Sequence, residues 1–322
     1  MERGSPNMTV SSTPEYPEYY SDNSTEHSEG HNSSGSLDIY DWMNLLSLLI
    51  APLGLLGNGA VLWLLGFRIR RNPFSVYILN LAAADALFLC SSFLRSILAL
   101  FRFNDVTWTI LSFFIYTSYT AGLSLLAAIS TERCLSAFFP LWYRCRRPKH
   151  TSAAICAGVW ALAGMCGLLS LVLWHSSDHN IFTFFTILVT WLLLLTCVMC
   201  VSSLTLLLRV QCRSRPPRLP RLYLLVLLTV LVFLLCCLPM GIWAVLSFWF
   251  HTYLMSYWLC DLLACVNSSV NPLIYFFVGR LGHKRREPLR VVLQRALGDE
   301  QELGGETTNT PHSSRPETTL RA

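Results

Sequence analysis

The sequence contains seven long apolar stretches, each long enough to cross a lipid bilayer as a helix. Crossing ~30 Å of hydrocarbon takes about 20 helical residues. Hydrocarbon offers no water to backbone polar groups, so only helices and closed barrels can span it. Apolar residues make up 53% of the chain and charged residues 13%, which argues against a soluble domain. The sequence therefore predicts an all-α membrane protein, a seven-transmembrane helix bundle, with spans at residues 45–67, 74–100, 108–135, 152–174, 181–208, 222–250 and 254–278.

Arginine and lysine are concentrated in every second loop between these spans. The loops concerned carry Arg68, Arg70, Arg71, then Arg144, Arg146, Arg147, Lys149, and then Arg209, Arg213, Arg215, Arg218 and Arg221. Because basic loops stay on the cytoplasmic side of a membrane, we expect an extracellular N-terminus, a cytoplasmic C-terminus and a multi-pass protein of the plasma membrane. The net charge of +5 follows from this topology and gives no reason to expect nucleic-acid binding.

Four segments are expected along the chain. Residues 1–43 form a polar extracellular tail, and Asn-X-Ser/Thr triplets predict glycosylation at Asn7, Asn23 and Asn32. Residues 44–279 form the seven-transmembrane domain. Residues 280–297 place apolar residues at helical spacing beside basic ones, which predicts a short amphipathic eighth helix on the membrane surface. Residues 298–322 are a disordered cytoplasmic tail, whose Ser and Thr residues are candidate phosphorylation sites for arrestin recruitment.

One carboxylate, Asp85, lies in the middle of the second span. Ionisable residues are costly in hydrocarbon, so each is a functional candidate. Its expected partners are the polar side chains at similar depth in the first and seventh spans, Asn58, Asn267, Ser268 and Asn271. Two interpretations stay open: a network that holds a sodium ion or a proton and changes with helix movement, or a hydrogen-bonded packing network.

Two prolines and one charged pair mark further positions in the spans. Pro239 in the sixth span and Pro272 in the seventh each remove a backbone hydrogen bond and favour a bend. Glu132 and Arg133 form an acid–arginine pair at the end of the third span, where it meets a basic loop. This position at a membrane boundary is typical of receptors that transmit a signal.

These residues belong to short motifs that resemble the rhodopsin-like G-protein-coupled receptors, or class A. The motifs cover all seven spans: Gly57-Asn58, Leu81–Asp85, Glu132-Arg133-Cys134 with Pro140, Trp160, Pro239 and Asn271–Tyr275. More narrowly, the chain resembles the Mas-related receptor family at Trp63–Arg68, Tyr77–Leu81, Ser130–Ser136, Trp142–Pro148 and Leu293–Leu297.

The resemblance implies roles for several residues. Arg133 would engage a heterotrimeric G protein, while Asn271, Pro272 and Tyr275 would form a switch in the seventh helix. Asp85 would anchor a sodium-linked network. The chain departs from the class pattern at Cys134 in place of tyrosine, at Cys237 in place of the toggle tryptophan, at Gly122 in place of a sodium-site serine and at Trp108 in place of a disulfide cysteine.

At the outer end, Arg95 and Asp261 are expected at nearly the same depth. Each lies ten residues outward of an intramembrane polar residue, which is about 15 Å along a helix. One hypothesis has them line a ligand pocket whose apolar wall is formed by Tyr116, Tyr119 and Trp243. The alternative is that they pair with each other as a structural bridge.

The expected function is that of a Mas-related receptor, which transmits an extracellular peptide or small-molecule signal to G proteins. The alternatives are a seven-helix transporter, which would also use Asp85 and helix breaks, or a receptor-like protein with mainly basal activity. No enzymatic role, metal site or cofactor is expected, apart from the sodium ion considered near Asp85. The expected partners are a heterotrimeric G protein, arrestin, an unidentified extracellular ligand and the bilayer.

Overall fold

The computed structural model describes residues 39–69, 72–101, 105–148, 150–174, 178–211, 224–236, 257–281 and 287–297. The described part is helical. Six helices contain spans long and apolar enough to cross a membrane, and a seventh, shorter apolar helix runs from Leu224 to Cys236. The predicted seven-helix bundle with a short C-terminal helix is therefore confirmed.

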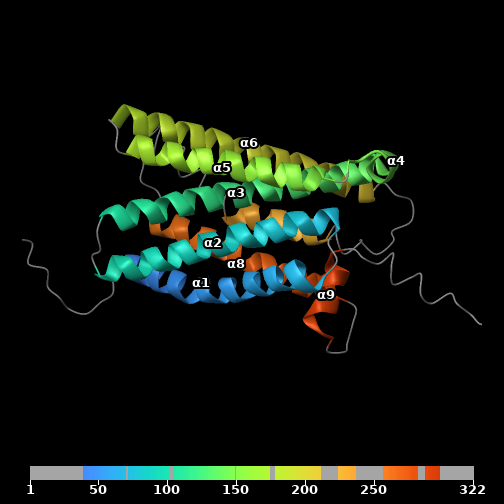
Figure 1. Cartoon of the computed structure of the whole chain (residues 1–322), viewed down its shortest axis with the longest axis horizontal. Helices are drawn as coiled ribbons and strands as arrows, with labels where there is room; N and C mark the ends of the chain where they lie inside the picture. Colours follow the sequence, from blue (N-terminus) through green and yellow to red (C-terminus); the bar gives the residue numbers. More distant parts are fainter. Residues whose placement is uncertain are drawn as a thin grey trace, which may run out of the picture. The chain divides into compact units, whose positions relative to one another are not determined.

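The described helices are labelled as in Figure 1. They are α1 (Ile39–Trp63, continued by the π-helical turn η1, Leu64–Arg68), α2 (Pro73–Phe101), α3 (Asp105–Phe138), α4 (Pro140–Cys145), α5 (Thr151–Trp174), α6 (Asp178–Gln211), α8 (Tyr257–Arg280) and α9 (Leu289–Ala296).

Several helices are longer than the apolar stretches that predict them. The sequence predicts the third span at 108–135 and the fifth at 181–208, but α3 runs from Asp105 to Phe138 and α6 from Asp178 to Gln211. Hydropathy marks where a helix leaves hydrocarbon, whereas backbone hydrogen bonding continues until the chain turns. The second half of the predicted sixth span, including Pro239, lies outside the described residues.

Helix α3 occupies the centre of the bundle. It packs against α2, α5 and α6, and Figure 1 shows it between the α5–α6 layer and α2. In its most apolar stretch 67% of the residues are buried inside the protein, compared with 28% in α1 and 22% in α5. The outer helices instead expose leucines such as Leu53 and Leu56, which is the expected surface of a helix that faces lipid.

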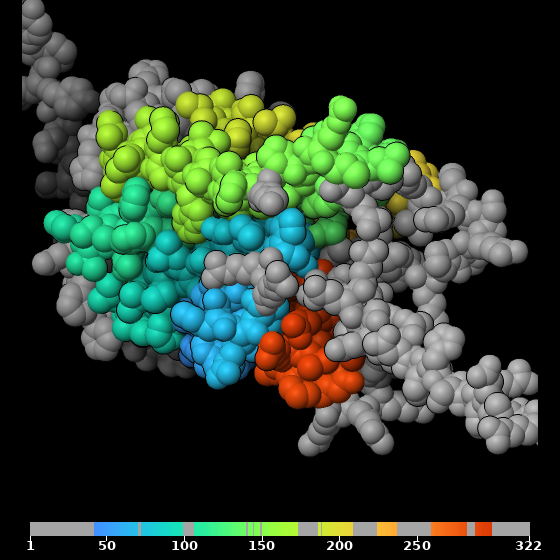
Figure 2. Space-filling model, turned by 45° about the vertical axis from the view of Figure 1, so that its right-hand side comes forward, coloured from blue at the N-terminus to red at the C-terminus, as the bar shows by residue number. Residues whose placement is uncertain are grey.

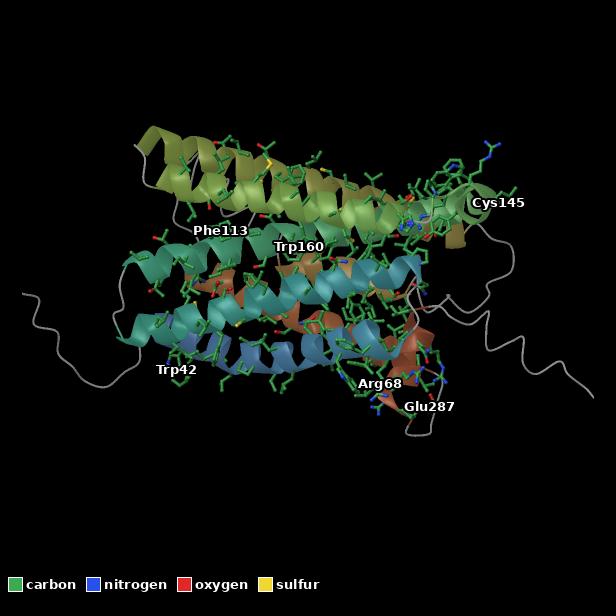
Figure 3. The ribbon with its side chains drawn as sticks, in the orientation of Figure 1. Trp42, Arg68, Phe113, Cys145, Trp160 and Glu287 are labelled. Carbon is green, nitrogen blue, oxygen red and sulfur yellow. The ribbon has the colours of Figure 1, made fainter. Side chains whose placement is uncertain are left out.

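Helices α4 and α9 lie at the same end of the bundle (Figure 1). Arg68, Cys145 and Glu287 are found toward this end and Trp42 toward the other (Figure 3). We call the first the basic end, because Arg68, at the end of η1, and the arginines Arg146 and Arg147, which follow α4, belong to it. The other is called the opposite end.

Helix α9 packs back against α8 at the basic end. It buries one face, formed by Val292, Leu293 and Ala296, as expected for an amphipathic helix. Figure 2 shows it as a compact orange patch beside the blue surface of the N-terminal helices. Gly279 allows this close approach, because a Cβ atom there would clash with the backbone carbonyl oxygen of Val292.

Gly279→Ala is expected to destabilise the protein, since the clash is with backbone and cannot be relieved by a side-chain rotation. Overpacking of this kind costs ~1–3 kcal/mol, so thermal unfolding in detergent should begin several degrees lower. Gly59→Ala is the matched control, because nothing lies within 4 Å of a Cβ there. Equal unfolding temperatures for the two variants would contradict this packing.

Candidate functional site

Glu132, the acid of the acid–arginine pair, is buried at the basic end. Its carboxylate forms an ion pair with Arg147, whose Nη2 lies 2.5 Å from Oε1 of Glu132. The side chains of Arg147 and Glu132 are only 5% and 7% exposed. Oε1 of Glu132 has no hydrogen-bond partner. Its contact with Arg147 is therefore an ion pair and not a hydrogen bond. Arg147 comes from the segment between α4 and α5, so the pair joins this loop to α3.

Arg147 makes further contacts that fix its guanidinium. Nη2 donates a hydrogen bond of 2.6 Å to Oγ of Ser152, at the start of α5. The same guanidinium lies 5.0 Å from the ring centroid of Tyr143 in α4. Tyr143 in turn hydrogen-bonds Glu132. Burial, reinforced by the negative charge of Glu132, raises the pKa of the Tyr143 phenol, so it stays protonated and can donate.

Arg133 lies in a different environment from Arg147. Its Cζ lies 3.6 Å from the ring centroid of Phe74, near the start of α2. This is a cation–π contact, which holds an arginine against a ring without neutralising its charge. The charge of Arg133 still acts on Tyr143, so Glu132, Arg133, Tyr143 and Arg147 form one electrostatic group.

Small polar side chains join α3 to α6 next to this group. The hydroxyls of Ser130 and Ser202 lie 2.8 Å apart. The thiol of Cys134, where class A receptors have tyrosine, lies 3.3 Å from Oγ1 of Thr205. These contacts let the two helices approach closely at the basic end.

The predicted intramembrane network is formed in part. Nδ2 of Asn271 donates a 2.8 Å hydrogen bond to Oδ2 of Asp85, which joins α8 to α2. Ser268 also hydrogen-bonds this carboxyl. Asn58 donates instead to the backbone carbonyl oxygens of Ser268 and Gly54, at 3.0 Å each, and joins α1 to α8. Asn267 is buried near the network, and its Oδ1 has no hydrogen-bond partner.

The other residues of the predicted switch lie further along α8. Pro272 is inside the helix and packs against α1 at Gly57, where a Cβ would lie 3.1 Å from the proline ring. Tyr275 is 1% exposed, and its hydroxyl has no hydrogen-bond partner. Gly122 of α3 faces Asp85, since a Cβ there would lie 3.7 Å from Oδ1. The sodium ion considered near Asp85 stays a prediction.

At the opposite end, Arg95 and Asp261 form an ion pair between α2 and α8. Their side chains are only 3% and 6% exposed. The guanidinium of Arg95 also lies 5.7 Å from the ring centroid of Trp108, the residue where the class places a disulfide cysteine. The structure thus brings the two charges together as the structural-bridge interpretation expects. Whether a ligand also reaches them stays a prediction.

The aromatic pocket candidates are only partly described. Tyr116 is close enough for its phenol to be affected by the charges of Arg95 and Asp261. Tyr119 packs on Phe88, with ring centroids 5.8 Å apart. Trp243 and Pro239, like the glycosylation candidates Asn7, Asn23 and Asn32, lie outside the described residues. A cavity of about 300 Å³ exists elsewhere, between α3, α5 and α6, and none of the four candidates that the structure describes is among its lining residues.

The sequence-based interpretation missed Arg147 as a site residue. It counted Arg147 only among the loop charges that set membrane orientation. Phe74 and Ser152 were missed as well, since nothing in their type or spacing distinguishes them. The one available signal was a buried acid, Glu132, that needed a cation from a neighbouring segment.

The described helices form a membrane bundle, and comparison with known proteins shows the class of protein to which it belongs. Residues 57–275 match the seven-transmembrane receptor (rhodopsin family) group. The chain is 45% identical to Mas-related G-protein coupled receptor member A of Rattus norvegicus, over 84% of this chain and 93% of the relative. It is 48% identical to member X2 of Macaca mulatta, over 80% and 83%, and 44% identical to member X1 of Homo sapiens, over 81% and 84%. The chain therefore belongs to the rhodopsin family of receptors and, within it, to the Mas-related G-protein-coupled receptors.

Removing either member of the Arg95–Asp261 pair is expected to destabilise the receptor. Arg95→Ala leaves a buried, uncompensated carboxylate, which costs ~3–5 kcal/mol. The double variant Arg95→Leu with Asp261→Leu removes both charges and should recover most of this loss. Thermal unfolding of purified receptor measures both, with Arg290→Ala on the exposed side of α9 as control. A single variant that unfolds at the wild-type temperature would show that the Arg95–Asp261 ion pair does not stabilise the protein.

Proposed function

We propose that the basic end of this Mas-related receptor faces the cytoplasm and that Arg133 contacts the G protein there. The observation that carries this proposal is the buried Glu132–Arg147 ion pair with Arg133 beside it. The position of Arg133 in the acid–arginine pair at this end of α3, and the membership of the chain in the receptor family, support a role for Arg133 toward the G protein. The positive loops at this end support the orientation, because basic loops are retained on the cytoplasmic side.

The opposite end is then extracellular and receives the signal. Two contacts join α2 to α8. The outer one is between Arg95 and Asp261, and the inner one, ten residues deeper in each helix, is between Asp85 and Asn271. Ten residues correspond to about 15 Å of helix. A peptide or small molecule that disturbs the outer pair would shift α8 against α2, and this shift would act directly on the inner hydrogen bond.

Further parts of the proposal rest on sequence alone. The plasma membrane is the proposed location, and the N-terminal tail is proposed to be glycosylated at Asn7, Asn23 and Asn32. Arrestin is proposed to bind the phosphorylated C-terminal tail. A sodium ion near Asp85 is proposed only with the amide oxygens of Asn58, Asn267 and Asn271 as its further ligands. These three oxygens have no hydrogen-bond partner.

Arg133→Ala is expected to abolish coupling while leaving the fold intact. Truncating one partner of a desolvated charged contact costs ~2–5 kcal/mol, which is more than a tenfold loss of affinity for the G protein. Inositol phosphate and cAMP measured in transfected cells, at matched surface levels, provide the test. Arg68→Ala is the control, because Arg68 is an exposed arginine at the same end. Equal signals from Arg133→Ala and the wild type would overturn the proposed role.

A further inference from the structure

A cavity of about 300 Å³ lies between α3, α5 and α6, away from the sites described above. Leu162 and Leu169 of α5 and Ile187 and Leu194 of α6 form its aliphatic walls. Each of these four side chains is between 39% and 54% exposed, so the cavity is open to the outside of the bundle. The α5 residues belong to the apolar span Thr151–Val172. The opening therefore faces hydrocarbon, and a molecule dissolved in the bilayer can enter it directly.

Trp191 of α6 lines the same cavity, and its indole N–H lacks an acceptor. Its Nε1 atom is buried, and no described residue accepts a hydrogen bond from it. A donor without an acceptor is costly in hydrocarbon, where water does not replace the missing partner. The neighbouring hydroxyl of Thr190 differs, because it donates a 2.7 Å hydrogen bond to the backbone carbonyl oxygen of Thr186. The lining thus contains an indole donor that the described part of the protein leaves unsatisfied.

We propose that this cavity binds an uncharged, lipophilic small molecule that enters from the bilayer and carries one hydrogen-bond acceptor, such as a ketone oxygen. The aliphatic walls contact its apolar body, and its oxygen accepts a hydrogen bond from Nε1 of Trp191. A charged molecule is disfavoured, because none of the lining residues carries a charge. This site is independent of the roles proposed for the two ends of the receptor.

The size of the cavity favours a small molecule over a membrane lipid. At about 300 Å³ it lies at the lower end of the range for small-molecule sites, roughly 300–1,000 Å³. Along α5 its lining extends from Leu162 to Leu169, which is about 10 Å of helix. A phospholipid could place only part of an acyl chain there, and that chain has no acceptor for Trp191. A compact, rigid ketone fits both the space and the donor, and it loses little conformational freedom on binding.

Photolabelling with benzophenone locates the site, because benzophenone is an uncharged lipophilic ketone that inserts into C–H bonds when irradiated. The full-length receptor is labelled in nanodiscs, and mass spectrometry identifies the modified residues. We expect label on the lining residues of α5 and α6. Leu162→Trp, which fills the cavity, should remove this label. Leu168→Trp is the matched control and should keep it, because Leu168 is an exposed residue of α5 that is not among the lining residues.

Competition by fluorenone and fluorene tests the hydrogen bond to Trp191. The two molecules share one rigid tricyclic skeleton, and only fluorenone has the ketone oxygen. A hydrogen bond to a donor that is otherwise unsatisfied contributes about tenfold in affinity. In the wild type, fluorenone should therefore displace the label at about a tenfold lower concentration in the nanodisc than fluorene. In Trp191→Phe, which keeps an aromatic ring but loses the N–H, the two competitors should be equally effective.

Four results would overturn the proposal. The first is label spread over other parts of the receptor, and the second is label at the cavity that Leu162→Trp does not reduce. The third is a wild type in which fluorene competes as well as fluorenone, which would mean that the cavity holds apolar chains without using Trp191. The fourth is a Trp191→Phe variant that still prefers fluorenone. The wild-type comparison does not depend on the folding of any variant.

Discussion

Inside a bilayer no water is available to polar side chains, and this constraint determines where the functional residues of this receptor meet. A charge buried there is stabilised by a partner on another helix or loop. Arg95 meets Asp261, Asp85 meets Asn271 and Glu132 meets Arg147. The first two contacts join α2 to α8, and the third joins α3 to the segment after α4. The apolar leucines that surround these contacts set the bundle in the membrane but do not specify which helix faces which.

The two contacts between α2 and α8 act as a pair. In each helix the two polar residues are ten positions apart, and the two helices run in opposite directions. Arg95 therefore lies at the depth of Asp261, and Asp85 lies at the depth of Asn271. In the proposed mechanism, a change at the outer contact would reach the inner contact along these two helices. Two glycines lie near the inner contact, between Asp85 and Asn271. Gly57 leaves space for the ring of Pro272, and Gly122 leaves space beside the carboxylate of Asp85. Small residues thus border the contact between Asp85 and Asn271 on the side of α1 and on the side of α3.

Much of this arrangement could be predicted from the sequence. The apolar stretches located six spans and, within the described residues, the part of the sixth predicted span from Leu224 to Cys236. The depth of Asp85 in its span correctly predicted Asn271 as a partner. The pairing of Arg95 with Asp261 could be stated only as one of two alternatives. Ten residues turn a helix by about 1000 degrees, ~80 degrees short of three full turns, so equal depth does not establish that two side chains face each other. The role of Arg147 as the partner of Glu132 could not be predicted, because a loop has no periodicity that indicates the direction of its side chains. Its charge was explained equally well by membrane orientation.

In this receptor the loop arginine Arg147 holds Glu132, and we propose that the neighbouring Arg133 contacts the G protein. Cryo-electron microscopy of the receptor bound to a heterotrimeric G protein tests this proposal. We expect the guanidinium of Arg147 to remain on the carboxylate of Glu132, while Arg133 leaves the ring of Phe74 and contacts the G protein. A complex in which Arg133 is bonded to Glu132 and makes no contact with the G protein would contradict it.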